Sequence, residues 1–242
     1  MFDAESIVLV AIITAMAAFI QRVTGFGFGI FVMMFFPHIM QTHTSATAVS
    51  TLVSCIVSVY NAIVYRKSVP YRKIVPLIIA ALVTIPIGVR LSVIVTGDIF
   101  KKALGIVLVA LSIYFLFFND KMRIKASVKN GLIAGGTGGI LTGLFSTGGP
   151  PIVLYLMNAL SDNLMYFASA QFYFGLTGIY STAVRFFSGI VNTEVIVYSL
   201  VGFGASMIGN FAGKRVFDKL NAKRLKQLVY LCMIVSGVVM VV

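Results

Sequence analysis

The chain has 242 residues, of which 59% are hydrophobic and only 11% are charged, and its mean hydropathy is +1.01. A water-soluble domain carries about 25% charged residues, so this composition excludes one and indicates an integral membrane protein. The net charge of +12 does not indicate a nucleic-acid partner, because the cations cluster in short loops between apolar runs, as the positive-inside rule describes.

The apolar runs have the length of membrane-spanning helices. A helix needs about 20 residues to cross the hydrocarbon core, and slightly shorter runs are completed by snorkelling side chains at their ends. The runs are continuous rather than alternating, so they predict helices and not barrel strands. The runs without Asp, Glu, Lys or Arg include residues 44–65, 74–89, 103–118, 163–184, 195–213 and 227–242. We therefore expect an all-α polytopic membrane protein, surrounded by lipid and crossing the cytoplasmic membrane several times.

Two smaller features fit this expectation. Asp3 and Glu5 stand where a secretory signal peptide has basic residues, so we expect no cleavable signal peptide. Cys55 and Cys232 lie deep in apolar runs, and we expect them to be small core residues rather than a disulfide or a metal pair.

Two apolar elements are interrupted by glycine, proline and hydroxyl residues. In the first, the pieces 6–20 and 25–40 are joined through "QRVT", and in the second, the pieces 131–145 and 150–160 are joined through "STGG". A helix of fifteen residues reaches only about 22 Å, which is short of a bilayer. Each interrupted element therefore either doubles back or crosses as a kinked and strongly tilted helix.

The chain contains an internal duplication. Gly88 and Arg90 correspond to Gly213 and Arg215 at a separation of 125 residues, and the motif "TGFGFGIF" corresponds to "FSTGGPPI" at a separation of 121. The expected repeats are residues 1–120 and 121–242. Each begins with a broken or re-entrant helix that is followed by three long transmembrane helices.

The loop charges favour an inverted arrangement of these repeats. If the interrupted elements double back, one side of the membrane receives fourteen cations and the other receives four, whereas single crossings divide them nine and nine. The positive-inside rule prefers the uneven division. We therefore expect two inverted-topology repeats with both termini outside.

Inverted repeats with interrupted helices at matching positions are typical of secondary transporters, whose substrate lies at the repeat interface. Irregular backbone at membrane depth must line protein or a watery cavity. A half-helix that begins after "STGG" would direct free N–H groups and its positive dipole end into that cavity, which favours an anion. The expected substrate-binding residues are Arg22, Thr24, Gly25, Gly27, Ser50, Ser146, Thr147, Gly148, Gly149 and Gln171.

Structural alternatives remain open for several of these residues. Arg22 is either a partner of the anion or a snorkelling arginine at a helix end. Ser50 and Gln171 either line the pathway or form hydrogen bonds between helices. Arg185 is more typical of an interfacial anchor than of a ligand, and His43 is expected at an aqueous boundary. The glycines between residues 131 and 143 have the spacing of close helix packing.

Other classes of function lack their characteristic residues. All seven carboxylates lie in termini, loops or helix ends, and the chain has no P-loop, no paired catalytic carboxylates and no histidine cluster. We therefore expect neither an enzyme nor a bound cofactor or metal. An outward-moving anion needs no coupling carboxylate, because the inside-negative potential contributes about 2.3 kcal/mol per charge per 100 mV.

At these motifs the chain resembles the TauE/SafE family of sulfite exporters and sulfonate permeases. The resemblance covers nearly the whole chain and depends on "TGFGFGIFVMMFFP", "HTSATAVSTL" and "STGGPPIVLYL". It implies export of sulfite, sulfoacetate or related sulfonates, with a site at the positions from Thr24 to Gly27 and from Ser146 to Gly149. The chain departs from the family at Phe26, Phe28 and Pro150, where glycine is common. An anion channel and a membrane accessory protein remain the alternatives, and a homodimer is an open alternative for assembly.

Overall fold

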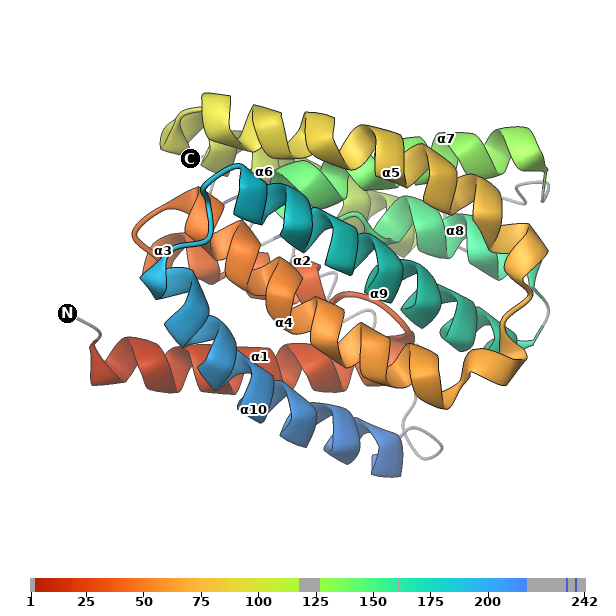
Figure 1. Ribbon diagram of the computed structural model, residues 1–242, viewed down its shortest axis with the longest axis horizontal. Helices are drawn as coiled ribbons and strands as arrows, with labels where there is room; N and C mark the ends of the chain where they lie inside the picture. Colours follow the sequence, from red (N-terminus) through yellow and green to blue (C-terminus); the bar gives the residue numbers. More distant parts are fainter. Residues whose placement is uncertain (1–2, 118–126, 161, 217–233, 235–237, 239–242) are drawn as a thin grey trace.

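The computed structural model describes residues 3–117, 127–160, 162–216, 234 and 238, and every element of regular structure in these residues is helical (Figure 1). The helices are α1 (Ala4–Thr24), α2 (Phe28–Met33), α3 (Phe36–Ile39), α4 (His43–Val64), η1 (Arg66–Ser68), α5 (Tyr71–Ile94), α6 (Gly97–Phe117), α7 (Val128–Phe145), α8 (Gly149–Ala159), α9 (Asn163–Phe187) and α10 (Thr193–Val216).

Four of these helices can cross a membrane by length and composition. They are α1, α4, α5 and residues Thr193–Arg215 of α10, with mean hydropathies from 1.6 to 2.3. The predicted all-helical, multi-pass protein is confirmed at this level. The last predicted run, residues 227–242, falls almost entirely outside the described residues.

The first helix is longer than the sequence predicted. The predicted piece ended at Ile20, but α1 continues to Thr24, and its 21 residues span about 31 Å. The polar side chains of this extra turn find partners inside the protein: Gln21 donates to Ser58 and Arg22 donates to Asn61. Because these groups are satisfied by neighbouring helices, the polar residues do not end the helix.

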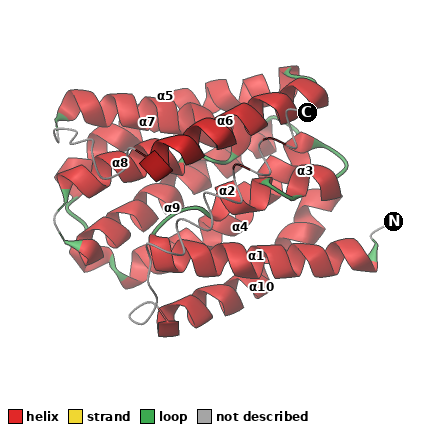
Figure 2. Cartoon of the chain, turned by 180° about the vertical axis from the view of Figure 1, so that it is seen from behind, coloured by secondary structure: helices red, strands yellow, loops and turns green. Residues whose placement is uncertain are grey.

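The long helices pack in pairs that form three layers. Helices α5 and α7 lie on one side, α1 and α10 lie on the other, and α4 packs against α9 between them (Figures 1 and 2). Glycines allow the closest of these contacts: a Cβ on Gly135, Gly139 or Gly143 would overlap the backbone of α5. The small-residue spacing in α7 therefore serves close packing, as the sequence predicted.

The two central helices run antiparallel. At one end of the molecule, the ring of Tyr65 from α4 lies 5.5 Å from the ring of Phe167 from α9. Towards the other end, Arg185 from the last turn of α9 donates to Thr47 near the start of α4. The midpoints of both helices therefore lie at the same depth in the molecule.

Each interrupted element returns to the end of the molecule where it began (Figure 1). Asp3, before α1, and Ile39, at the end of α3, line the same surface cavity. In the second element, Gly131 near the start of α7 lies beside Tyr155 of α8, where a Cβ would be 3.4 Å from the Tyr155 ring. The chain breaks after α1 and α7 are therefore turning points within the protein.

Candidate functional site

The two chain breaks have the same backbone design. Helix α1 ends at Gly25 and helix α7 ends at Ser146, both in the left-handed region, with φ of 84° and 58°. Gly27 then caps α2 and Gly148 caps α8. Both pairs are 121 residues apart, which is the separation at which the sequence motifs of the two breaks correspond.

The two breaks are in direct contact. A Cβ on Gly29 would clash with the carbonyl oxygen of Ser146, and a Cβ on Gly149 would lie 3.6 Å from the ring of Phe26. Only a glycine permits the first of these approaches. The structure therefore brings together the two segments that the sequence singled out.

A buried cavity lies where the breaks meet. The cavity has a volume of about 50 Å³, counted as the space that the centre of a water molecule can occupy. This is enough for a few waters or a small ion. The interrupted helices contribute the stretches from Phe26 to Ile30 and from Ser146 to Gly149, together with Gln21 and Thr142. The middle of α4 contributes Thr51, Ser54 and Ser58, and the middle of α9 contributes Phe174, Thr177 and Gly178.

The lining of this cavity is polar but uncharged. Among the described residues, no Asp, Glu, Lys, Arg or His lines it. Helix α8 begins at the cavity with Gly149, Pro150 and Pro151, and the first N–H groups of a helix have no intrahelical acceptor. The prolines sit where no N–H is required, so they start the helix without loss. The site therefore offers the backbone N–H of Gly149 and the hydroxyl of Thr147, which has no partner among the described residues, at the positive end of a helix dipole.

Ser146 is the residue with the most demanding position in the site. It is the one non-glycine residue with positive φ among the described residues, and such a conformation costs a non-glycine residue about 1–2 kcal/mol. Its hydroxyl lies 3.0 Å from Thr51 Oγ1 and 3.1 Å from Ser50 Oγ. The side chain that makes the conformation unfavourable is thus the one that joins the second break to α4.

A pair of glutamines joins the first break to α9. Gln171 donates from Nε2 to the carbonyl oxygen of Gly25 at 2.9 Å, and its Oε1 accepts from Gln21 Nε2 at 3.2 Å. Gln21 Nε2 also donates to Ser58 Oγ at 2.9 Å. Gln171 and Ser50 are fully buried, and both make the interhelical hydrogen bonds that the sequence left as one alternative.

Two polar atoms of the lining residues have no hydrogen-bond partner among the described residues. They are Thr147 Oγ1 and Gln21 Oε1. Thr147 is 1% exposed and Gln21 is 2% exposed, so bulk water does not satisfy them. A buried polar group without a partner is costly, and such groups are typical of sites that bind a ligand.

Thr24 shapes the first break from outside the cavity lining. Its Oγ1 donates to the carbonyl oxygens of Ile20 and Phe26, at 2.9 and 2.7 Å, and its own carbonyl oxygen accepts from the Tyr166 hydroxyl. The hydroxyl is occupied by the backbone of the turn. Thr24 therefore holds the turn that places Phe26 and Gly27 in the cavity wall.

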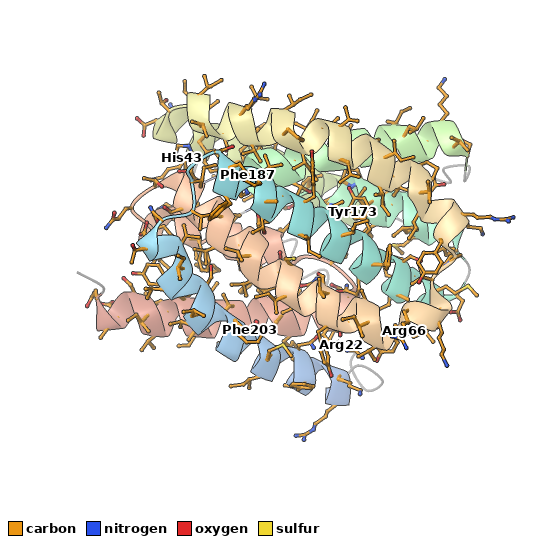
Figure 3. All side chains as sticks on the ribbon, viewed as in Figure 1. Arg22, His43, Arg66, Tyr173, Phe187 and Phe203 are labelled. Carbon is orange, nitrogen blue, oxygen red and sulfur yellow. The ribbon has the colours of Figure 1, made fainter. Side chains whose placement is uncertain are left out.

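Arg22 lies next to the site but not in the cavity wall (Figure 3). Its guanidinium donates to Asn61 Oδ1 at 3.2 Å and to the Tyr65 hydroxyl at 2.6 Å, and it stacks over the ring of Phe167 at 4.7 Å. The side chain is 6% exposed and lies at the end of the molecule that carries Arg66. The structure thus places Arg22 among helix ends rather than beside the hydroxyls of the cavity.

Arg185 is not the interfacial anchor that the sequence favoured. Its side chain is 1% exposed, and it donates to Thr47 Oγ1 and to the carbonyl oxygens of Thr142 and Gly143. These carbonyls belong to the last turn of α7, the negative end of the helix dipole. The anchor interpretation failed because the sequence does not show that α7 ends beside Arg185.

The sequence analysis also made predictions for His43 and for the two cysteines. His43 bonds the carbonyl oxygen of Ser92 at 2.8 Å and lines a surface cavity at the end of the molecule, in agreement with a boundary position. Cys55 is a buried free thiol of the α4 and α9 contact, as predicted, whereas Cys232 lies outside the described residues.

The sequence analysis missed the contribution of α4. Thr47, Thr51, Ser54, Ser58 and Asn61 recur every three or four residues and form one polar stripe along this helix. Serine and threonine hydroxyls in a helix also donate to the carbonyl oxygen one turn earlier, as Thr51 does to Thr47. A single hydroxyl residue in a helix therefore does not indicate a binding site. The unbroken spacing of the whole stripe was the signal that could have identified it.

Comparison with known proteins identifies the family. No curated protein and no solved structure matches the chain. The family model described as Sulfite exporter TauE/SafE matches residues 10–240, which is nearly the whole chain and includes both breaks. The chain therefore belongs to the TauE/SafE family of membrane transporters.

Proposed function

We propose that this protein is a secondary transporter that exports small organosulfur or related organic anions, such as sulfite, sulfoacetate and other sulfonates. The proposal rests on one observation: the two chain breaks meet at a hydroxyl-lined cavity. This cavity lies halfway along α4 and α9. Membership in the TauE/SafE family supports the sulfur-containing substrate class.

The electrostatics of the cavity suit a transported anion. The N-terminus of α8 and the hydroxyl of Thr147 supply donors, while no cation among the described residues lines the wall. An anion held by neutral donors and a helix dipole is bound without a permanent ion pair, so it can also leave. The inside-negative potential then drives it outwards, with about 2.3 kcal/mol per charge per 100 mV.

We further propose that residues 1–120 and 121–242 are inverted-topology repeats with re-entrant first elements. The equivalent backbone positions in the two breaks, and the return of each interrupted element to its starting end, support this arrangement. The loop cations agree, because doubling back leaves fourteen of them on one side of the membrane and four on the other. By the positive-inside rule, the side with fourteen would be cytoplasmic and the N-terminus would lie outside.

The residues of the proposed substrate site divide into two groups. Gly27, Ser146, Thr147, Gly148 and Gly149 line the cavity and would contact the anion. Thr24, Gly25, Ser50 and Gln171 hold the lining residues through hydrogen bonds. Arg22 joins the second group, because its guanidinium holds the ends of α1 and α4.

Flux into proteoliposomes under an imposed, reversible membrane potential tests the proposal. Sulfite and sulfoacetate are compared in the parent and in Ser146→Gly, which keeps the left-handed backbone but removes the hydroxyl. Thr137→Val is the matched control, because Thr137 is exposed on α7 and bonds only its own helix. Saturable, potential-driven flux that Ser146→Gly lowers and Thr137→Val does not is the expected result.

Other outcomes separate the alternatives. Conductance without saturation or exchange would indicate an anion channel at the same site. Absence of flux for every small anion, with folded protein in the membrane, would contradict transport and favour an accessory protein. Flux that is indifferent to Ser146→Gly would move the site away from the two breaks.

A further inference from the structure

The two glutamines beside the first break have a fixed orientation. A carbonyl oxygen only accepts hydrogen bonds, so the group of Gln171 that meets the carbonyl of Gly25 must be the NH₂ group. The other end of that amide is Oε1, and it faces Gln21. Gln21 must therefore present its own NH₂ group to Gln171, because the reverse orientation would place two carbonyl oxygens against each other.

This chain of constraints leaves a buried acceptor on a residue that lines the cavity. With its NH₂ group committed to Gln171 and Ser58, Gln21 has its Oε1 buried and without a partner among the described residues. An amide oxygen cannot bond the oxygen of a fully deprotonated anion, and it repels one. The hydroxyl of Thr147, which also lacks a partner among the described residues, can donate to an anionic oxygen.

We infer that the site selects an oxyanion that also carries one hydrogen-bond donor, and that Gln21 Oε1 accepts that donor. The hydroxyl tautomer of hydrogensulfite has this chemistry, whereas the sulfite dianion and fully ionised sulfoacetate do not, so within the proposed substrate class the inference favours sulfite over simple sulfonates. The inference rests on the proposed function, since it names the protonation state of the substrate at the same cavity. Each transported anion then carries its own proton, without a titrating side chain in the wall.

No titratable side chain lines the site among the described residues. The lining residues from α1, α2, α4, α7, α8 and α9 include no Asp, Glu, His, Cys, Lys, Arg or Tyr. The adjacent charged groups, Arg22 next to Gln21 on α1 and Arg185 at the Thr142 carbonyl, lie outside the lining. A pH dependence of transport near neutrality therefore reports the protonation of the substrate.

Two anions of equal charge and similar size test the donor requirement. Hydrogensulfite and methanesulfinate both carry an SO₂⁻ group, and they differ in a hydroxyl against a methyl. Uptake of each into proteoliposomes is measured at several pH values with the parent protein. We expect hydrogensulfite to be preferred by about tenfold or more, because the methyl group leaves the buried acceptor unpaired.

The pH dependence of flux through the parent protein is a second, independent test of the donor requirement. At constant total sulfite, flux should fall as the pH rises through the second dissociation of sulfurous acid, because the hydrogensulfite fraction falls. Methanesulfinate remains a monoanion over this range, so its flux should stay constant. A sulfite flux that rises with the dianion would overturn the inference.

Variants of Gln21 test the assignment to this residue. Gln21→Met removes the acceptor and should reduce the preference to within about twofold, and Gln21→Asn, which withdraws the amide, should lower it more mildly. Thr137→Val, at an exposed position of α7 that bonds only its own helix, should retain the preference.

The outcomes are distinguishable from failure of the proposed function. Equal transport of both anions by the parent, or a preference that survives both Gln21 variants, would overturn the inference and leave anion transport intact. Absence of flux for both anions would instead contradict the proposed function.

Discussion

Arg22 and Arg185 occupy equivalent places towards opposite ends of the molecule. Arg22, in the last turn of α1, bonds the Tyr65 hydroxyl after α4 and covers the ring of Phe167 near the start of α9. It therefore joins the end of the first interrupted helix to the ends of both central helices.

Arg185 joins the corresponding three helix ends towards the other end of the molecule. From the last turn of α9, it bonds the Gly143 carbonyl in the last turn of α7 and Thr47 near the start of α4. A shift of 120 residues carries Tyr65 to Arg185 and Thr47 to Phe167, and a shift of 121 carries Arg22 to Gly143. The connection is thus repeated, but a different helix supplies the guanidinium.

We expect Arg185→Ala to destabilise the protein by roughly 3 kcal/mol or more, because it removes two charged hydrogen bonds to buried carbonyl oxygens. Arg185→Lys should cost less, since an ammonium keeps the charge but lacks the planar fork. Thermal unfolding in detergent measures both, with Arg90→Ala at an exposed position of α5 as the control. Equal stability of Arg185→Ala and the control would contradict the structural role.

The arginines also show where sequence reasoning stops. The sequence predicted membrane helices, the two breaks and the residues in them, because glycine, proline and hydroxyl residues in an apolar run have local physical causes. It did not predict that Arg22 meets Tyr65 or that Arg185 meets Gly143. These contacts depend on helix packing over separations of about 40 residues, which local patterns do not encode.

The contact between the two breaks depends on the absence of a side chain at Gly29. Gly29→Ala would push a methyl group into the Ser146 carbonyl, and we expect it to lower stability by more than about 3 kcal/mol or to abolish folding, because neither break can move alone. Gly204→Ala is the matched control: nothing lies within 4 Å of its Cβ position in α10, so it should be neutral or stabilising by about 0.5–1 kcal/mol. Fluorescence-detected size-exclusion chromatography and thermal unfolding compare the two. A well-folded, equally stable Gly29→Ala protein would mean that the breaks are not packed as described.

The topology of the proposed inverted repeats can be measured by labelling introduced cysteines from each side of the membrane. If both interrupted elements double back, Lys129→Cys and Lys214→Cys should react from the cytoplasm, while Ser188→Cys should react from outside. All three positions are exposed and Cys55 is buried, and the labelling is done in a Cys232→Ser background so that the second native thiol does not react. Single crossings would place Lys129 and Lys214 on opposite sides, so that result would exclude the inverted arrangement.

Thr147 should show opposite effects on stability and on transport. Its hydroxyl is buried without a partner among the described residues, so Thr147→Val removes an unsatisfied group and keeps the shape of the side chain. We expect the variant to be as stable as the parent or more stable by up to about 1 kcal/mol, yet to lose about tenfold or more in anion flux if the hydroxyl donates to the substrate. Thermal unfolding and proteoliposome flux are compared with Thr137→Val, which should change neither. A loss of stability in Thr147→Val would mean that the hydroxyl has a structural partner, whereas unchanged flux would exclude its contact with the anion.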